Sequence, residues 1–529
     1  MEEYIVTLKD HSDLDEFYHD METPGGNLYI PNRSVDLVLR RPTSRNTHYF
    51  LNEEEASELR KDPRVLAVEK TPKALGMKVR PMWTQTSGNW DKSSANTSSH
   101  KNWALLRCTE GIQRPGWGSD STSGQSATVT VMTEGRNVDV VIVDGHFDPS
   151  HPEYAVNSDG TGGTRVVQYN WFQHDLGSGT GTYTYTPYTG TGAEADNNHG
   201  AHVAGTVAGN TQGWARSANI YNINPYVNDE LLLFDYIRAF HANKPVNPTT
   251  GRRNPTICNN SWGYSYSLPI NLITNIYYRG AYVGGAPYNY NSLITYGVEN
   301  WSGYTDTLSR YAALEADVED AITDGIIMVG AAGNSYGKID VPGGLDYNNF
   351  YIWNGYIVFY MRGGAPNSTP GNICVGSIGT TSNETKASYS MNGPRIDIFS
   401  PGSSIMSSVN STASGGTTDP RNSSYSIAKY NGTSMASPQV CGVLACALET
   451  YPDMTQAMAK QYITSIATRD QITDTGGSYS DYTSLQGAAN RFLYHKKERE
   501  STGQAWPKKT HFVRPSTGAV YPRTKIRRK

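Results

Sequence analysis

Hydrophobic residues in the middle of the chain fall into short continuous runs. VDVVIVD (138–144) and IIMVGAAGN (326–334) are such runs, and both are rich in β-branched residues. Segments with helical spacing lie between runs of this kind, as in ALEADVEDAITDG (313–325). Strands buried on both faces have this composition, and their alternation with helices is typical of parallel sheets. Residues 101–487 are therefore predicted to form one large α/β domain.

The first 77 residues show a different order of strand and helix patterns. These patterns follow one another as β-α-β-β-α-β, from YIVTLKD (4–10) to RVLAVEK (64–70). Asn52 and Glu55 have the spacing of a capping box, which marks the start of the second helix. Residues 1–77 are thus predicted to form a small α+β domain of the ferredoxin-like type. Residues 78–100 are polar and rich in Ser and Asn, which predicts a linker.

Three further segments depart from these patterns. Residues 264–311 and 336–366 are rich in Tyr, Asn and Gly without clear periodicity, and we expect surface insertions of the large domain there. Residues 488–529 are predicted to form a basic tail, because positions 491–529 hold 12 Lys or Arg and only two acidic residues. A solvated tail is the simpler interpretation, and contact with a polyanion is the alternative.

The overall composition excludes several classes of protein. The 529 residues carry a formal net charge of −4, so the chain is not a polycation that coats nucleic acid. The sequence shows no run of about 18 apolar residues and no secretory signal at its acidic start, so neither a membrane span nor an export signal is expected. The five cysteines lack Cys-x-x-Cys spacing and are predicted to be buried apolar residues, with a disulfide of Cys108 left open.

Three polar residues stand at predicted element boundaries of the α/β domain. Asp144 ends an apolar strand, His199 opens a helix of small residues, and Ser434 comes just ahead of another apolar helix. Each has an ordinary structural interpretation on its own, as a turn aspartate, a helix-start histidine and an N-cap serine. Together they supply an orienting carboxylate, a general base and a nucleophile. We therefore predict that these three residues form a catalytic triad.

The residues around the three positions resemble the signature blocks of the subtilisin-like serine proteases, the subtilases. The resemblance is carried by HGAHVAGTVAG (199–209), GTSMASP (432–438), NNSWG (259–263), AAGNS (331–335) and the tract 373–402. It implies a three-layer α/β/α fold with a mostly parallel sheet. It also implies serine endopeptidase activity on polypeptide substrates through an acyl-enzyme, with no required cofactor. Subtilases are commonly secreted, and this is the only indication of a compartment.

The resemblance implies roles for residues beyond the triad. Asn334 takes the place of the oxyanion-hole donor. The segment expected to pair with the substrate backbone consists of Ser261, Trp262 and Gly263. Small side chains favour a roomy pocket for the substrate residue before the scissile bond, with ordinary strand packing as the alternative. This pocket is expected at Ala331, Ala332 and Gly333.

The end of the N-terminal domain, residues 52–72, resembles the inhibitor-type propeptides of subtilases. The resemblance implies that this domain assists folding and then blocks the cleft as an intramolecular inhibitor. Self-cleavage is then expected between residues 72 and 82, with Met77 as the first candidate for the residue before the cut. An unrelated ferredoxin-like module is the alternative.

Some positions depart from the family pattern. His146 stands where the family usually has Gly. Glu153 matches an acidic calcium-ligand position, but the loop 210–213 is too short to resemble the calcium-binding loop, so a structural calcium is not assigned. His146, His151 and His202 are expected to be structural, and no metal site is predicted. A catalytically impaired subtilase-like scaffold for binding or assembly is the alternative to a protease.

Overall fold

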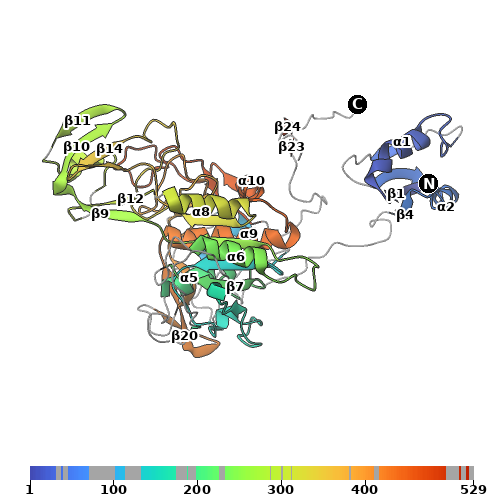
Figure 1. Ribbon diagram of the computed structural model, residues 1–529, viewed down its shortest axis with the longest axis horizontal. Helices are drawn as coiled ribbons and strands as arrows, with labels where there is room; N and C mark the ends of the chain where they lie inside the picture. Colours follow the sequence, from blue (N-terminus) through green and yellow to red (C-terminus); the bar gives the residue numbers. More distant parts are fainter. Residues whose placement is uncertain are drawn as a thin grey trace. The chain divides into compact units, whose positions relative to one another are not determined.

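The chain forms two compact units, Met1–Arg80 and Pro81–Lys529. The structure is a computed structural model, and its helices and strands are drawn in Figure 1. It describes residues 1–30, 37–39, 46–70, 102–112, 133–173, 187–188, 198–225, 233–285, 287–299, 302–310, 312–380, 383–409, 416–495, 511–513 and 520–522. The predicted linker 78–100 and the predicted cut after Met77 lie outside the described residues.

The first unit is a four-stranded antiparallel sheet with two α-helices. Its elements are β1 (Glu2–Leu8), η1 (His11–Asp13), α1 (Leu14–Glu22), β2 (Leu37–Leu39), β3 (Asn46–Leu51), α2 (Glu53–Leu59) and β4 (Val65–Lys70). The sheet order is β2-β3-β1-β4, and Val6, Phe17 and Tyr49 are buried between sheet and helices. Asn52 caps α2 reciprocally with Glu55, as the spacing predicted. The order of elements is the expected ferredoxin-like one.

The second unit is built on a nine-stranded sheet in the order β21-β22-β17-β16-β13-β8-β5-β7-β6. In chain order its strands are β5 (Asp139–Val143), β6 (Val166–Val167), β7 (Asn219–Ile223), β8 (Thr256–Asn260), β13 (Ile327–Ala331), β16 (Ile373–Ile378), β17 (Ile398–Pro401), β21 (Thr468–Arg469) and β22 (Arg491–Phe492). Every pair is parallel except β21 with β22 at one edge. The continuous apolar runs 138–144 and 326–334 therefore mark central parallel strands, as predicted.

Helices cover both faces of this sheet. They are α4 (Trp103–Glu110), α5 (Asn198–Ala208), α6 (Leu233–Asn243), α8 (Ala312–Thr323), α9 (Thr433–Thr450) and α10 (Gln456–Ile466). Val140 and Ile142 of β5 pack in one core with α5 and α9, whereas Val141 and Val143 pack in another with α6 and α8. Alternate residues of one strand thus pack against helices on opposite faces of the sheet, which confirms the three-layer α/β/α fold. Figure 1 shows α6 and α8 side by side on one face.

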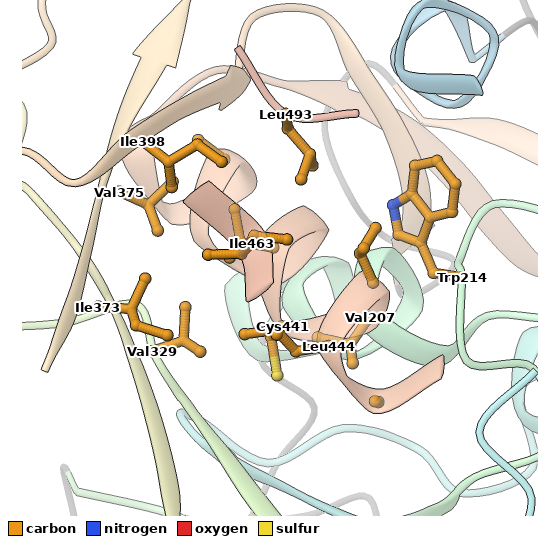
Figure 2. Packing of buried hydrophobic residues seen from close by; sticks show 14 of the residues in the cluster. Val207, Trp214, Val329, Ile373, Val375, Ile398, Cys441, Leu444, Ile463 and Leu493 are labelled. Atoms are coloured by element: carbon orange, nitrogen blue, oxygen red, sulfur yellow. The ribbon is translucent and has the colours of Figure 1, made fainter. Parts of the chain in front are cut away.

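The larger core centres on helix α9. Figure 2 shows Val329, Ile373 and Val375 of the sheet facing Cys441 and Leu444 of this helix. All five cysteines of the chain are buried and unpaired, so Cys108 forms no disulfide. Their burial agrees with the prediction that they act as small apolar residues.

The two predicted insertions pair with each other. They contain β9 (Ser265–Pro269), η6 (Ile270–Leu272), β10 (Ile273–Tyr278), β11 (Ala281–Gly285), α7 (Tyr290–Ile294), β12 (Tyr304–Leu308), β14 (Phe350–Trp353) and β15 (Tyr356–Phe359). One antiparallel sheet has the order β11-β10-β14-β15, and β9 pairs with β12. Ile273, Ile276 and Tyr351 are buried in a separate core beneath them. The segments 264–311 and 336–366 therefore form one substructure, seen in Figure 1 at one end of this unit.

The end of the central sheet lies within the predicted tail. Phe492 of β22 pairs with Phe399 of β17, and both Phe492 and Leu493 are fully buried. The tail predicted at 488–529 therefore begins too early, because its first residues complete the core. This strand was not predicted from the sequence because it is only two residues long, too short to show a strand pattern.

Smaller elements complete the unit. They are η3 (Pro152–Tyr154), η4 (Trp171–Gln173), β18 (Ile405–Val409), β19 (Thr417–Asp419), β20 (Asn422–Tyr430), β23 (His511–Val513) and β24 (Val520–Pro522). Strands β18, β20 and β19 form a three-stranded sheet, and β23 pairs with β24. In the described part of the chain, no helix combines the length and the apolar character that crossing a membrane requires.

Candidate active site

Asp144 and His199 form a hydrogen-bonded pair at one end of the central sheet. Asp144 directly follows β5 and is fully buried, and His199 is the second residue of α5. The Nδ1 atom of His199 lies 2.9 Å and 3.0 Å from the two carboxylate oxygens of Asp144. This geometry fixes the orientation of the imidazole ring. The other ring nitrogen, Nε2, lies on the side of the ring away from Asp144.

The close approach of α5 to the end of β5 depends on Gly200. A Cβ atom at this position would lie 2.0 Å from the carbonyl oxygen of Gly145. No side chain fits within that distance, so glycine is required directly after the histidine. The Asp144 carboxylate is held by the backbone N–H of Gly145 at 2.8 Å.

The charge of Asp144 acts directly on His199. Burial lowers the pKa of His199, but the charge of Asp144 and its hydrogen bond outweigh this effect. The pKa of His199 is therefore raised above its ordinary value. A base with such a pKa binds a proton more readily, and the imidazolium that results is stabilised by the carboxylate.

Ser434 lies in the first turn of helix α9, behind the N-cap Gly432. Its position inside the helix differs from the prediction, which placed it just ahead of the first turn. Its Oγ donates to the carbonyl oxygen of Ser261 at 3.0 Å, and Ser261 Oγ donates to the carbonyl oxygen of Ser434 at 3.0 Å. These two bonds fasten the start of α9 to the segment that follows β8.

Asn334 is oriented by the residue next to Ser434. The backbone N–H and the hydroxyl of Thr433 both donate to Asn334 Oδ1, each at 2.9 Å. Because the amide oxygen accepts both bonds, the Nδ2 group is left as the donor of this side chain. The loop after β13 therefore presents an N–H donor beside the serine.

One cavity of about 320 Å³ brings most of the predicted residues together. Its lining contains the predicted residues Ser261, Trp262, Gly263, Ala331, Ala332, Gly333, Asn334 and Ser434. The small residues 331–333 thus line the cavity, while Ala332 also packs in the larger core. Asp144 and His199 are not among the residues that line this cavity.

Several lining residues were not among the predicted site residues. Ser335 and Thr433 lie in the family-like blocks 331–335 and 432–438, but no role was predicted for them. The others carried no signal in the sequence and are Tyr264, Ser265, Asp306, Leu308, Gly364 and Asn367. Asp306 and Leu308 belong to β12, within a segment predicted only as a surface insertion. The pairing of β12 with β9 brings them to the cavity, and no local pattern indicates such a long-range contact.

The segment 261–263 is held firmly along one wall of the cavity. Asn367 Nδ2 donates to the carbonyl oxygen of Trp262 at 2.6 Å, and Tyr264 N–H donates to Ala365 at 3.1 Å. A Cβ atom on Gly263 would lie 3.2 Å from the carbonyl oxygen of Ala365. The wall is therefore rigid and closely packed, as a binding surface for an extended chain requires.

Glu153, at the acidic calcium-ligand position, is held by protein donors. This buried carboxylate accepts hydrogen bonds from Thr211 Oγ1 at 2.6 Å and from the backbone N–H groups of Thr211 and Gln212 at 3.0 Å and 3.1 Å. It also accepts one from a cation of the chain, because Arg421 Nη2 donates to Glu153 Oε1 at 2.7 Å. The guanidinium thus places a positive charge beside the carboxylate.

The nearby histidines also have structural partners. Nε2 of His202 lies 2.7 Å from the carbonyl oxygen of Ile405, and Nε2 of His151 lies 2.9 Å from that of Ser426. Burial lowers the pKa of His202 to about 3, so its ring is neutral. Within the described ranges, no group of three or more His, Cys, Asp or Glu side chains is placed to hold a metal ion.

Comparison with known proteins gives the family of the chain. Residues 135–492 match the subtilase family, Peptidase_S8. An extracellular protease of Xanthomonas campestris pv. campestris is 28% identical over 364 residues, which are 68% of this chain and 50% of that protein. Subtilisin E of Bacillus subtilis is 27% identical over 336 residues, which are 63% of this chain and 61% of that protein.

A solved structure of a cold-adapted subtilisin-like serine proteinase is 20% identical, covers 75% of this chain and 98% of its own, and has a TM-score of 0.44. The chain spans about half to three fifths of the length of the curated relatives described above. The family match covers more than half of the chain, within the second unit. The chain therefore belongs to the subtilase family.

Proposed function

We propose that this protein is a serine endopeptidase with Ser434 as nucleophile, His199 as general base and Asp144 as its orienting carboxylate. The observation that carries the proposal is the single cavity bounded by Ser434, by the amide of Asn334 and by the rigid segment 261–263. A nucleophile, an oxyanion donor and a wall for an extended chain are the parts that acyl transfer from a peptide needs. The names of the relatives, subtilisin and extracellular protease, support the same activity.

Attack on the peptide begins with transfer of the hydroxyl proton. Ser434 Oγ donates to Ser261 without substrate, so the hydroxyl turns to His199 Nε2 when the peptide binds. The oxygen then forms a bond to the carbonyl carbon, and His199 holds the proton as an imidazolium stabilised by Asp144. His199 gives this proton to the amine as the C–N bond breaks, which leaves the acyl-enzyme. Water then attacks the acyl carbon while His199 takes a proton from it. The bond to Ser434 Oγ breaks as His199 returns the proton to that oxygen.

The negative oxygen of the tetrahedral intermediate is stabilised by two N–H donors. They are Asn334 Nδ2 and the backbone N–H of Ser434, which lies in the first turn of α9. Thr433 holds the Asn334 amide in place before the reaction, so little reorganisation is needed at the transition state. The substrate backbone pairs along 261–263, and a side chain next to the cleaved bond enters the cavity.

We further propose that the protein is made as a precursor. The N-terminal unit has the expected ferredoxin-like order, and its last described strand, β4, ends at Lys70. The polypeptide that follows this strand would reach the cleft and be cut between residues 72 and 82, with Met77 as the favoured residue before the cut. The domain acts as an intramolecular inhibitor before the cut, and after the cut it inhibits as a separate chain until it is degraded.

The experiment compares wild type with Ser434→Ala and with Ser465→Ala as a matched control. Ser465 is an exposed serine of α10, and its Oγ donates to the carbonyl oxygen of Tyr462 in the same helix at 2.8 Å. Hydrolysis of an unfolded protein and the intact mass of the chain are followed together. Activity and cleavage in wild type and control, and neither in Ser434→Ala, support the proposal. Absence of both in all three proteins favours the impaired scaffold instead.

A further inference from the structure

A second, smaller cavity shares part of its wall with the site cavity. The residues common to both linings are Asp306, Leu308 and Ser335. The smaller cavity has a volume of about 20 Å³, which is enough for one water-sized group, and Glu299 is part of its wall. We call the two neighbouring cavities together the path, with Ser434 in the wall of the outer cavity and Glu299 in the wall of the inner one.

The described charged groups along this path are acidic side chains. Asp306 lines both cavities and is exposed, and Glu299 lines the inner one and is 9% exposed. Among the described residues, neither lining contains a Lys, Arg or His. A cationic group inside the path would therefore meet two carboxyl groups and no positive charge from its walls.

Glu299 has an unmet need for a hydrogen-bond donor. Among the described residues, its buried Oε1 atom has no hydrogen-bond partner. Lys386 is a buried cation whose charge acts on Glu299, but its Nζ donates to the carbonyl oxygens of Ala387 and Ser390 at 3.0 Å and 2.6 Å. A buried carboxyl oxygen without a donor is costly, and a cationic donor that arrives through the cavity would remove this cost.

The electrostatics agree with this geometry. Burial raises the pKa of Glu299 well above its ordinary value, the charge of Lys386 opposes this change, and the charge of Asp306 adds to it. A positive group between the two carboxyl groups would relieve their repulsion and favour the ionised form of Glu299.

The position of the cavity shows which part of a substrate would enter. In the proposed reaction, the attacked carbonyl carbon lies against Ser434 and its oxygen against Asn334. The Cα atom bonded to this carbonyl carbon carries the side chain of the residue before the scissile bond. Ser434 and Asn334 both line the cavity, so this side chain starts next to it. That side chain is thus the one directed along the path toward Asp306 and Glu299.

We propose that the protein cleaves after basic residues, with Asp306 and Glu299 binding the lysine or arginine side chain before the scissile bond. This inference rests on the proposed endopeptidase function and names its substrate class. It also gives the insertion a role, because Asp306 lies on β12 and Glu299 lies between α7 and β12. In this arrangement Asp306 binds the cation in the outer cavity and Glu299 binds it at the inner end.

The test uses peptide amides that differ only in the residue before the cleaved bond, which is Arg, Lys, Phe or Leu. We expect kcat/KM for the Arg or Lys substrate to exceed that for Phe or Leu by about tenfold or more, the effect of a hydrogen bond to a charged group. Asp306→Asn should lower the Arg/Phe ratio by about tenfold. Glu319→Gln, a neutralised exposed acid on α8, is the matched control and should leave the ratio unchanged.

Glu299→Gln provides a second variant, whose fold is checked by its rate on the Phe substrate. We expect it to lower the Arg/Phe ratio as well. A faster reaction of Phe or Leu than of Arg and Lys in wild type would overturn the inference, as would an unchanged ratio in Asp306→Asn. Hydrolysis of an unfolded protein is measured in parallel. If wild type hydrolyses neither this protein nor any peptide, the proposed function itself fails, and the inference fails with it.

Discussion

Replacement of Arg421 by Met tests whether a guanidinium takes the place of a metal in this fold. Arg421 donates to Glu153 at 2.7 Å and to the two carboxylate oxygens of Asp419 at 2.9 Å and 2.6 Å. The side chains of both acids are fully buried. The variant keeps much of the side-chain volume but leaves two buried carboxylates without their cation.

The expected loss follows from this burial. Removal of one partner from a buried ion pair costs about 3–5 kcal/mol, because the remaining buried charge loses its counter-ion and is not solvated by water instead. Arg238→Met is the matched control, since Arg238 pairs with Asp320 and Asp324 at the surface. Exposed pairs of this kind contribute about 0–1 kcal/mol, so the control should lose far less stability.

Urea unfolding measures the free energy of unfolding of both variants in a Ser434→Ala background, which prevents self-digestion. Each protein is examined with calcium and with a chelator. We expect Arg421→Met to lose about 3–5 kcal/mol and the parent protein to be indifferent to calcium and chelator. A loss no larger than that of Arg238→Met would refute the reasoning, as would a clear stabilisation of the parent by calcium.

Three further predictions concern the catalytic groups. Asn334→Ala should lower kcat with little change in KM. Loss of such a donor in subtilisin costs about 10²–10³ in kcat. A raised KM at unchanged kcat would contradict the assigned role of Asn334. The rate should rise with pH as His199 loses its proton, with a midpoint above 6.5 because Asp144 raises the pKa of His199. Asp144→Asn should move this midpoint to lower pH. An unmoved pH profile would count against the assigned pairing of Asp144 with His199. Gly200→Ala should abolish activity and lower the Tm, whereas Gly379→Ala, where a Cβ meets nothing nearer than 3.6 Å, should do neither.

Much of the fold could be predicted from local patterns. The runs 138–144 and 326–334 are apolar on both faces because β5 and β13 lie inside the sheet between helical layers. The start of α2 followed from the side chains of Asn52 and Glu55, which satisfy each other's backbone N–H groups. These signals are local, so they do not depend on distant parts of the chain.

The missed features all depend on long-range pairing. Strands β10 and β14 hydrogen-bond although about seventy residues separate them, and buried and exposed residues show no clean alternation along either strand. Asp306 lines the cavity only because β12 pairs with β9. The guanidinium of Arg421 reaches Glu153 from a sheet that is distant in the sequence, which no spacing rule could indicate.

Reaction with a fluorophosphonate tests the central claim most directly, because this reagent modifies a serine only when its hydroxyl is activated. The mass of the labelled chain and of its proteolytic peptides identifies the modified residue. The account predicts a single adduct on Ser434, lost in Ser434→Ala and formed much more slowly in His199→Ala. No adduct on wild type, or equal labelling of wild type and His199→Ala, would contradict it.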